Sequence, residues 1–179
     1  MDLLNTEQAL KQYVDLVIKE ARSNLAKRNA SGKLSKSLKN TGVELTSKGI
    51  TGGIEMEYYG EFVDKGVSGV EKKYDTPYSY KSKGGKFGLK GMPPTKKLDK
   101  WAIRRKIAPR DKKGRFLPRQ SVLFLIARGI FKNGMKPTLF LTKPFEKMRK
   151  DLPVKMRTAF IEDAKGKLKE VLKTIEFDQ

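Results

Sequence analysis

The chain has 179 residues and a net charge of +20 at pH 7, with 34% charged and only 37% hydrophobic residues. This balance predicts a single domain, residues 1–179, with a modest core, charged extensions and part of its order supplied by neighbouring subunits. Cysteine and histidine are both absent, which excludes disulfides, thiolate chemistry, the Ser/His/Asp arrangement and most zinc sites.

The first expected element is an amphipathic helix, because apolar residues recur at three- and four-residue steps from Leu10 to Leu25. Asn5 or Thr6 is expected to cap it, since Gln8 lies three residues after Asn5 as a capping box requires. The helix should end near residues 28–30. Its polar face mixes acidic residues with lysines, which favours a core helix over a membrane-surface helix.

A two-residue apolar period then predicts an antiparallel hairpin with one buried face and a turn at Lys48-Gly49. Gly52-Gly53 in the second arm indicates a bulge or a close backbone approach. The segment 58–66 is expected to end the second strand and bend over the first helix. The alternating apolar residues are Val43, Leu45, Ile50, Ile54, Met56 and Tyr58.

Positive charge is concentrated in the middle of the chain. Residues 65–136 hold 21 lysines and arginines against four acidic residues, which accounts for +17 of the net charge of +20. Residues 67–94 lack periodicity and predict a long loop or arm. Its tyrosines and lysines suit stacking on bases and neutralising phosphates, but we favour an arm that folds only against a neighbouring subunit.

Helices are expected in the second half of the chain. Thr95 is expected to cap the first, Pro118 to start the second and Asn133-Gly134 to end it. Residues 136–141 are compatible with a short strand. Further helices should start near Pro144 and after Pro153, the last running to about residue 175. Its amphipathicity is imperfect, so it is a candidate to pack on a partner.

The sequence offers little support for catalysis. Glu162-Asp163 is expected to be solvated, and the basic middle holds too few acidic residues for the metal cluster of a nuclease. We therefore expect no enzyme activity, no catalytic residue, no metal, no cofactor and no small-molecule substrate.

The distribution of apolar residues argues against a membrane protein as well. No apolar run approaches the roughly 20 residues that a membrane-spanning helix needs. The N-terminus lacks the basic start and apolar stretch of a signal peptide. We expect a protein made and used in a cytoplasm, or in particles assembled there.

The basic middle of the chain is the candidate partner surface. Its field attracts polyanions, either nucleic acid or the acidic face of a protein, and the two alternatives stay equally open. The residues expected to face DNA or a partner are Lys96, Lys97, Lys100, Arg104, Arg105, Lys106, Arg110, Lys112, Lys113 and Arg115.

Short motifs flank this region in a fixed order. A Ser-Gly-x-Leu-x-x-Ser-Leu segment is followed by Tyr-x-x-Phe-Val-x-x-Gly and, after an insertion, by Gly-Met-Lys-Pro-Thr-Leu-Phe-Leu-Thr-Lys-Pro-Phe. This order resembles the tail-completion, or head–tail joining, proteins of long-tailed bacteriophages. The motif residues are Gly32, Leu34, Tyr59, Phe62, Val63, Gly66, Pro137 and Phe140. The basic insertion is larger than is usual in that family.

The resemblance implies an α+β domain. In it, an N-terminal amphipathic helix packs on a small antiparallel sheet, with further helices in the C-terminal half. The core would span about residues 5–66 and 134–175, and the long basic insertion about residues 67–133. The resemblance also implies a structural virion protein that forms a homo-oligomeric ring at the portal–tail junction. Its partners would be itself, adjacent portal, connector or tail proteins, and genomic DNA in the conduit. The alternative is a basic nucleic-acid-binding protein that acts alone.

Overall fold

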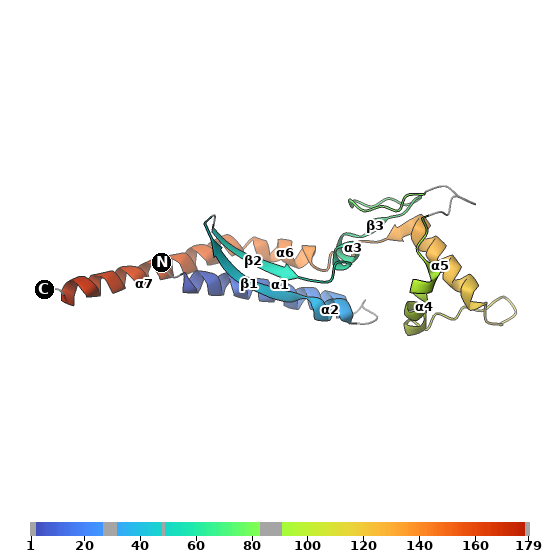
Figure 1. Ribbon diagram of the computed structural model, residues 1–179, viewed down its shortest axis with the longest axis horizontal. Helices are drawn as coiled ribbons and strands as arrows, with labels where there is room; N and C mark the ends of the chain where they lie inside the picture. The colour runs from blue at the N-terminus through green and yellow to red at the C-terminus, as the bar shows by residue number, and fades with distance from the viewer. Residues whose placement is uncertain (1–2, 27–31, 48, 83–90, 178–179) are drawn as a thin grey trace. The chain divides into compact units, whose positions relative to one another are not determined.

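Figure 1 shows a computed structural model of the chain, which describes residues 3–26, 32–47, 49–82 and 91–177. The chain divides into two compact units. We call Met1–Glu57 with Phe140–Gln179 the helix–hairpin unit, and Tyr58–Leu139 the basic unit. Helices and small antiparallel sheets are both present, so the expected α+β class is confirmed. The expected insertion, residues 67–133, lies wholly within the basic unit.

The helix–hairpin unit is built around helix α1 (Leu4–Ala26), which buries the expected apolar stripe. The helix packs on an antiparallel hairpin of β1 (Lys39–Thr46) and β2 (Gly49–Glu55), as expected. The expected buried face of the hairpin is wrong, because Val43, Ile50 and Ile54 are only half-buried and Leu45 is 52% exposed. A short helix, α2 (Lys33–Ser37), precedes the hairpin and contributes the buried Leu34. The expected end of the first helix at residues 28–30 lies outside the described residues.

The hairpin contains one irregularity. Thr41 and Gly42 of β1 together lie opposite Gly53 of β2, so the extra residue belongs to the first strand. The expectation of a bulge in the second arm is therefore wrong, because the bulge lies in the first. A Cβ added to Gly52 would lie 3.2 Å from Cγ of Leu10 on α1, so the close approach at this glycine is made by a side chain and not by a second backbone.

Two C-terminal helices, α6 (Thr142–Arg149) and α7 (Leu152–Phe177), complete the helix–hairpin unit and pack on α1. Asp163 of α7 is only 7% exposed. Its Oδ1 accepts hydrogen bonds from the backbone N–H (2.9 Å) and side-chain amide (2.8 Å) of Asn5. Its Oδ2 accepts from the backbone N–H (2.9 Å) and hydroxyl (2.7 Å) of Thr6.

Asp163 thus caps α1 from the other end of the sequence. The first N–H groups of a helix have no partner within that helix, and a carboxylate there also meets the positive end of the helix dipole. Two expectations are wrong here for this reason. Asn5 and Thr6 lie inside the first turn and receive the cap rather than supply it, and Asp163 is not solvated.

The basic unit holds α3 (Gly60–Lys65), β3 (Val67–Ser68), α4 (Thr95–Arg104), α5 (Arg119–Asn133) and β4 (Gly134–Met135). The strand expected over residues 58–66 is wrong, because the backbone turns into α3. An ion pair between Glu61 and Lys65, one turn apart at 2.8 Å, supports the helix. A short apolar run does not distinguish strand from helix by itself.

Two other boundaries differ from expectation. Residues 136–141 form no strand, since Pro137 lacks a backbone donor and Leu139 has a φ of +50°. The N-cap of α4 is Pro94 rather than Thr95. The start of α5 after Pro118 and its end before Gly134 are confirmed.

The expected arm, residues 67–94, is described at 67–82 and 91–94, and its residues 70–82 pack on their own chain. The ring of Tyr78 lies 4.6 Å from that of Phe62, and the ring of Tyr80 lies 6.1 Å from that of Phe131. The backbone N–H of Tyr80 donates to the carbonyl of Ser68 at 2.8 Å. An arm ordered only by a neighbour is therefore wrong for these residues, and residues 83–90 lie outside the described part.

A crossing of glycine backbones holds the basic unit together. Gly66 (φ +75°, ψ 179°) and Gly134 (φ +72°, ψ −163°) adopt a backbone conformation that only glycine reaches without strain. A Cβ on Gly66 would lie 2.6 Å from the nitrogen of Pro137, and one on Gly134 would lie 2.5 Å from the nitrogen of Gly69. The antiparallel pairing of β3 with β4 passes through this crossing.

Candidate functional site

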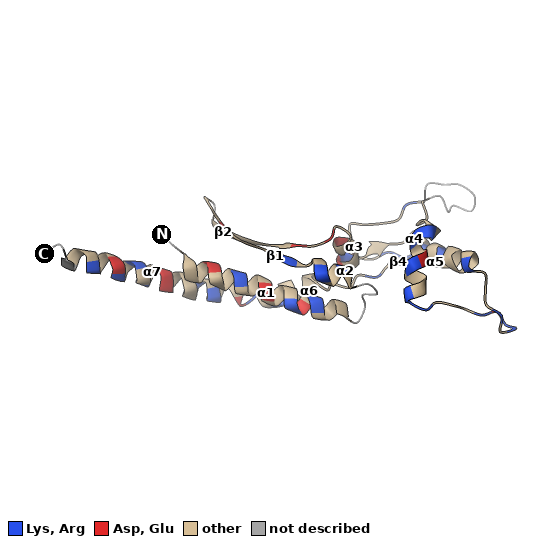
Figure 2. Ribbon diagram, turned by 60° about the horizontal axis from the view of Figure 1, so that its bottom comes forward, with Lys and Arg blue, Asp and Glu red and all other residues tan. Residues whose placement is uncertain are grey.

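The candidate site is the basic surface of the basic unit, formed by α4, the two residues after it and the turn 109–117. All ten residues expected to face DNA or a partner are exposed. They are Lys96, Lys97, Lys100, Arg104, Arg105, Lys106, Arg110, Lys112, Lys113 and Arg115. Figure 2 shows the lysines and arginines of α4 as blue segments of its ribbon.

Helix α4 presents its cations on one face. Lys96, Lys100 and Arg104 follow one another at four-residue steps, opposite the buried Ala102 that packs toward α5. Like charges at this spacing destabilise a helix, and lysines in its first turn face the positive end of the dipole. These charges therefore act against the stability of α4, which favours a role in binding.

The turn 109–117 is ordered by its own hydrogen bonds. Oδ1 of Asp111 accepts from the backbone N–H groups of Lys113 and Arg115, both at 2.9 Å. Oδ2 of Asp111 accepts from Nε of Arg115 at 3.0 Å. The Arg110 guanidinium lies 4.0 Å from the ring centroid of Phe116. The turn thus holds Lys112 and Lys113 at its tip without help from another chain.

The acidic residues of this surface are engaged internally. The pKa of the Asp111 carboxyl lies below its usual range, mainly because the backbone N–H of Arg115 donates to it. Desolvation raises this pKa, but the side chain of Arg115 and the backbone N–H of Lys113 lower it further. Asp99 of α4 pairs with Arg119 at the start of α5. Their charge offsets two arginines of the unit and leaves the lysines to dominate the field.

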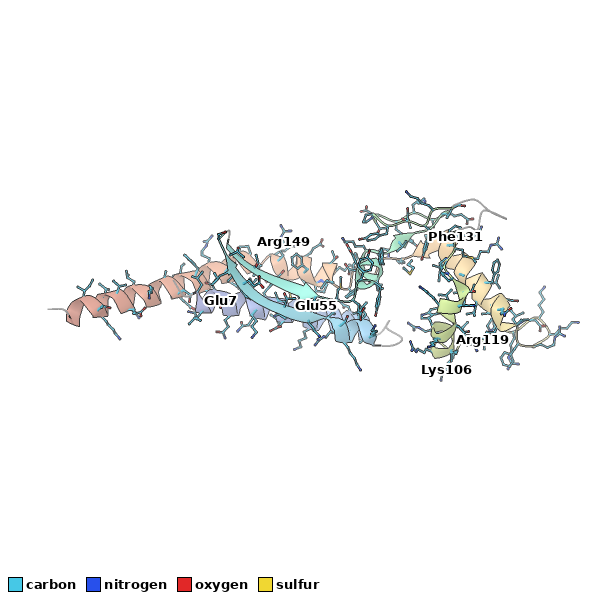
Figure 3. The ribbon with its side chains drawn as sticks, in the orientation of Figure 1. Glu7, Glu55, Lys106, Arg119, Phe131 and Arg149 are labelled. Atoms are coloured by element: carbon cyan, nitrogen blue, oxygen red, sulfur yellow. The ribbon has the colours of Figure 1, made fainter. Side chains whose placement is uncertain are left out.

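An open hollow of about 400 Å³ lies between α4, the turn and α5. Its floor includes Ala102 and Val122, and Lys106 and Arg119 lie at its rim. Figure 3 shows these two side chains near each other, one just after α4 and the other at the start of α5. The arrangement combines an apolar floor with a cationic rim, which suits a polyanion or the acidic edge of a protein.

The motif residues have structural positions in both units. Leu34 and Phe140 are buried in the helix–hairpin unit, and Gly32 has a φ of +67° at the start of α2. Within the basic unit, the backbone N–H of Thr138 donates to the carbonyls of Val63 (3.2 Å) and Asp64 (3.1 Å). The second and third motif segments, far apart in the sequence, therefore meet beside Gly66.

An aromatic groove of about 660 Å³ lies elsewhere on the basic unit, among Tyr59, Phe62, Pro77, Tyr78, Tyr80 and Met135. The pKa of Tyr78 is raised, mainly by its hydrogen bond to Glu61 and also by desolvation. Because Tyr78 and Tyr80 pack on rings of their own chain, they are not the free stacking platform that the sequence suggested.

Searches for a metal cluster, a membrane-spanning helix and similar proteins gave no positive result for the described residues or the sequence. Within the described ranges, no three acidic side chains gather where they could hold a metal ion. No helix found there is long and apolar enough to cross a membrane. No protein-family model, curated protein or solved structure matches this chain.

Sequence reasoning missed two features. The buried carboxylate of Asp163 gave no local signal, since it caps a helix that begins far away in the chain. The exposed apolar face of α7 was noticed only as imperfect amphipathicity, although Ile161, Leu168 and Ile175 recur at intervals of seven residues.

Proposed function

We propose that the chain is a structural subunit of the neck or tail of a bacteriophage virion. In this proposal it acts as a tail-completion or head–tail joining protein and forms a homo-oligomeric ring at the portal–tail junction. Its partners are other copies of itself and adjacent portal, connector or tail proteins, with genomic DNA in the conduit as a further contact of the basic surface.

The observation that carries this proposal is the meeting of the second and third motif segments. Thr138 bonds to the backbone of α3, and Gly66 leaves no room for a side chain beside Pro137. The second and third motif segments, which resemble the phage family, thus form one backbone junction and are not two unrelated sequence matches. Backbone contacts among several of the motif residues support the family resemblance better than the sequence match alone does.

The surfaces support an assembly subunit rather than an enzyme. Large apolar side chains are exposed on α5 and along α7, including Leu125, Leu168 and Ile175. Both edges of the two-stranded hairpin are also without a further strand among the described residues. Exposed apolar faces and open strand edges are typical of surfaces that neighbouring subunits cover.

Electron microscopy tests this proposal. We expect rings in the purified protein, and the protein at the neck or tail of particles made in cells that express the neighbouring virion genes. A chain that stays monomeric at all concentrations and never enters particles would contradict the proposal.

A second candidate function is nucleic-acid binding by the isolated protein. The observation that favours it is the basic surface, where ten exposed cations lie on α4, the two residues after it and the turn 109–117. Such a surface would neutralise phosphates without reading sequence, and its affinity would fall steeply with salt.

Neutralising the tip of the turn tests this second candidate. For the double variant Lys112→Gln and Lys113→Gln, we expect weaker binding to duplex DNA and a salt dependence reduced by roughly two units of log K against log salt, about one per lost phosphate contact. The matched control is Lys169→Gln with Lys173→Gln on α7, which removes the same charge from the other unit. Equal loss in both pairs would indicate a general charge effect and no specific surface.

A further inference from the structure

Helix α7 has two distinct faces. One face carries Ala159 and Asp163, four residues apart, which are the buried residues among the described side chains 152–175 of this helix. Asp163 binds the start of α1, and Ala159 lines a hollow together with Ala9 and Gln12 of α1. This face is therefore occupied within the chain.

The other face is apolar and exposed. Ile161, Leu168 and Ile175 recur at intervals of seven residues, with Ala164 and Val171 between them. Each residue turns a helix by about 100°, so the three lie roughly 120–160° around α7 from Asp163. The large apolar side chains of this stripe are between 43% and 63% exposed: Ile161, Leu168, Val171, Leu172 and Ile175.

The stripe extends beyond the part of α7 that α1 can cover. Every residue from Lys165 to Ile175 is exposed, and the red end of α7 continues past the N-terminal end of α1 in Figure 1. Five half-exposed aliphatic side chains amount to an apolar patch on the order of 500 Å², at the upper end of what a monomer normally shows. Two such patches in contact would bury on the order of 1,000 Å², which reaches the lower limit for a specific interface.

We propose that this stripe pairs with the same stripe of α7 in a second copy of the chain, with the two helices parallel and in register. A seven-residue apolar repeat is the pattern by which helices pair in coiled coils, because it keeps one seam facing the partner. Parallel pairing places Ile161, Leu168 and Ile175 each against its own counterpart.

The residues beside the seam fit this arrangement. In a parallel pair, Lys167 lies beside Leu172 of the second copy, and Lys165 lies beside its Phe160. The long lysine stems can cover these apolar side chains while the ammonium groups stay in water. No two lysines are opposed across the seam. The inference rests on the proposed function only in requiring self-association. It names one self-pairing surface, which closes at two copies, so the ring needs a further contact between subunits.

Sedimentation of the full chain over a range of concentrations tests the surface. We expect the double variant Leu168→Gln and Ile175→Gln to weaken self-association at least tenfold. The control, Lys169→Gln with Lys173→Gln, changes the same stretch of helix off the stripe and should associate like the original chain. Unchanged association in the first variant, with helix content preserved by circular dichroism, would overturn the inference.

Cross-linking tests the orientation, because the chain has no cysteine of its own. Leu168→Cys and Ile175→Cys should each form a disulfide between two copies under mild oxidation, whereas Lys169→Cys should not. No disulfide at either seam position would overturn parallel pairing. Rings formed by a chain whose seam cysteines give no disulfide overturn the inference and leave the proposed function standing. Pairing through α7 in a protein that never enters particles supports the inference and contradicts the proposed function.

Discussion

Gly134→Ala is expected to unfold the basic unit under conditions where the original chain is folded. Alanine is strained by roughly 1–3 kcal/mol in the backbone conformation of Gly134. Forcing its Cβ against the backbones of Val67 and Gly69 costs about 1–3 kcal/mol more. Together these costs are a large part of the stability of a typical domain, about 5–15 kcal/mol.

The single tryptophan gives a reporter for this unit. Trp101 lies on α4, which packs on α5, and α5 ends directly before Gly134. Its fluorescence during urea denaturation should show a much lower midpoint for Gly134→Ala. Gly129→Ala is the matched control, because this glycine lies inside α5 and a Cβ there meets no atom within 4 Å. It should stabilise the helix by about 0.5–1 kcal/mol. Equal midpoints for the two variants would disprove the backbone crossing.

Asp163→Ala is expected to destabilise the helix–hairpin unit and leave the basic unit unchanged. The substitution removes the acceptor for four hydrogen bonds from Asn5 and Thr6 and leaves the first N–H groups of α1 without that cap. We expect the thermal midpoint measured by circular dichroism to fall by roughly 5–10 °C. The Trp101 signal should keep its midpoint, and Glu162→Gln, one residue earlier on α7, should resemble the original chain.

The same carboxylate predicts a pH dependence. Burial by itself raises the pKa of Asp163, but the hydrogen bonds from Thr6 and Asn5 outweigh it and hold the pKa below its usual range. A group with a depressed folded-state pKa stabilises the fold above its unfolded pKa, about 3.9 for aspartate. That contribution is lost as the pH falls through the folded-state pKa. The difference in stability between the original chain and Asp163→Asn should therefore shrink as the pH falls below about 4. A difference that stays constant from pH 7 to pH 3 would contradict an ionised cap.

Local patterns predicted the elements whose signals are local. The stripe from Leu10 to Leu25 predicted α1, the two-residue period predicted the hairpin, and Pro118 and Gly134 marked the ends of α5. These predictions succeeded because periodicity and backbone preference act within a few residues.

The failures depended on tertiary structure. The capping of α1 joins residues more than 150 positions apart in the chain, and no sequence window contains both partners. The segment 58–66 reads as a strand by its apolar residues, yet Glu61 and Lys65 pair one helical turn apart. For the candidate site, the ten cations were predicted and are exposed. The internal engagement of Asp111 that shapes their turn was not.

The pairing of β3 with β4 has a consequence for how this chain can vary. Gly69 and Gly134 lie in backbone contact beside the paired strands β3 and β4, so the two ends of the long segment between them are close together. Its length can therefore change at little cost in closure entropy, which grows only slowly with the number of residues. A segment of different length and charge could therefore replace this one between Gly69 and Gly134. The motif residues beside the two glycines would keep their positions.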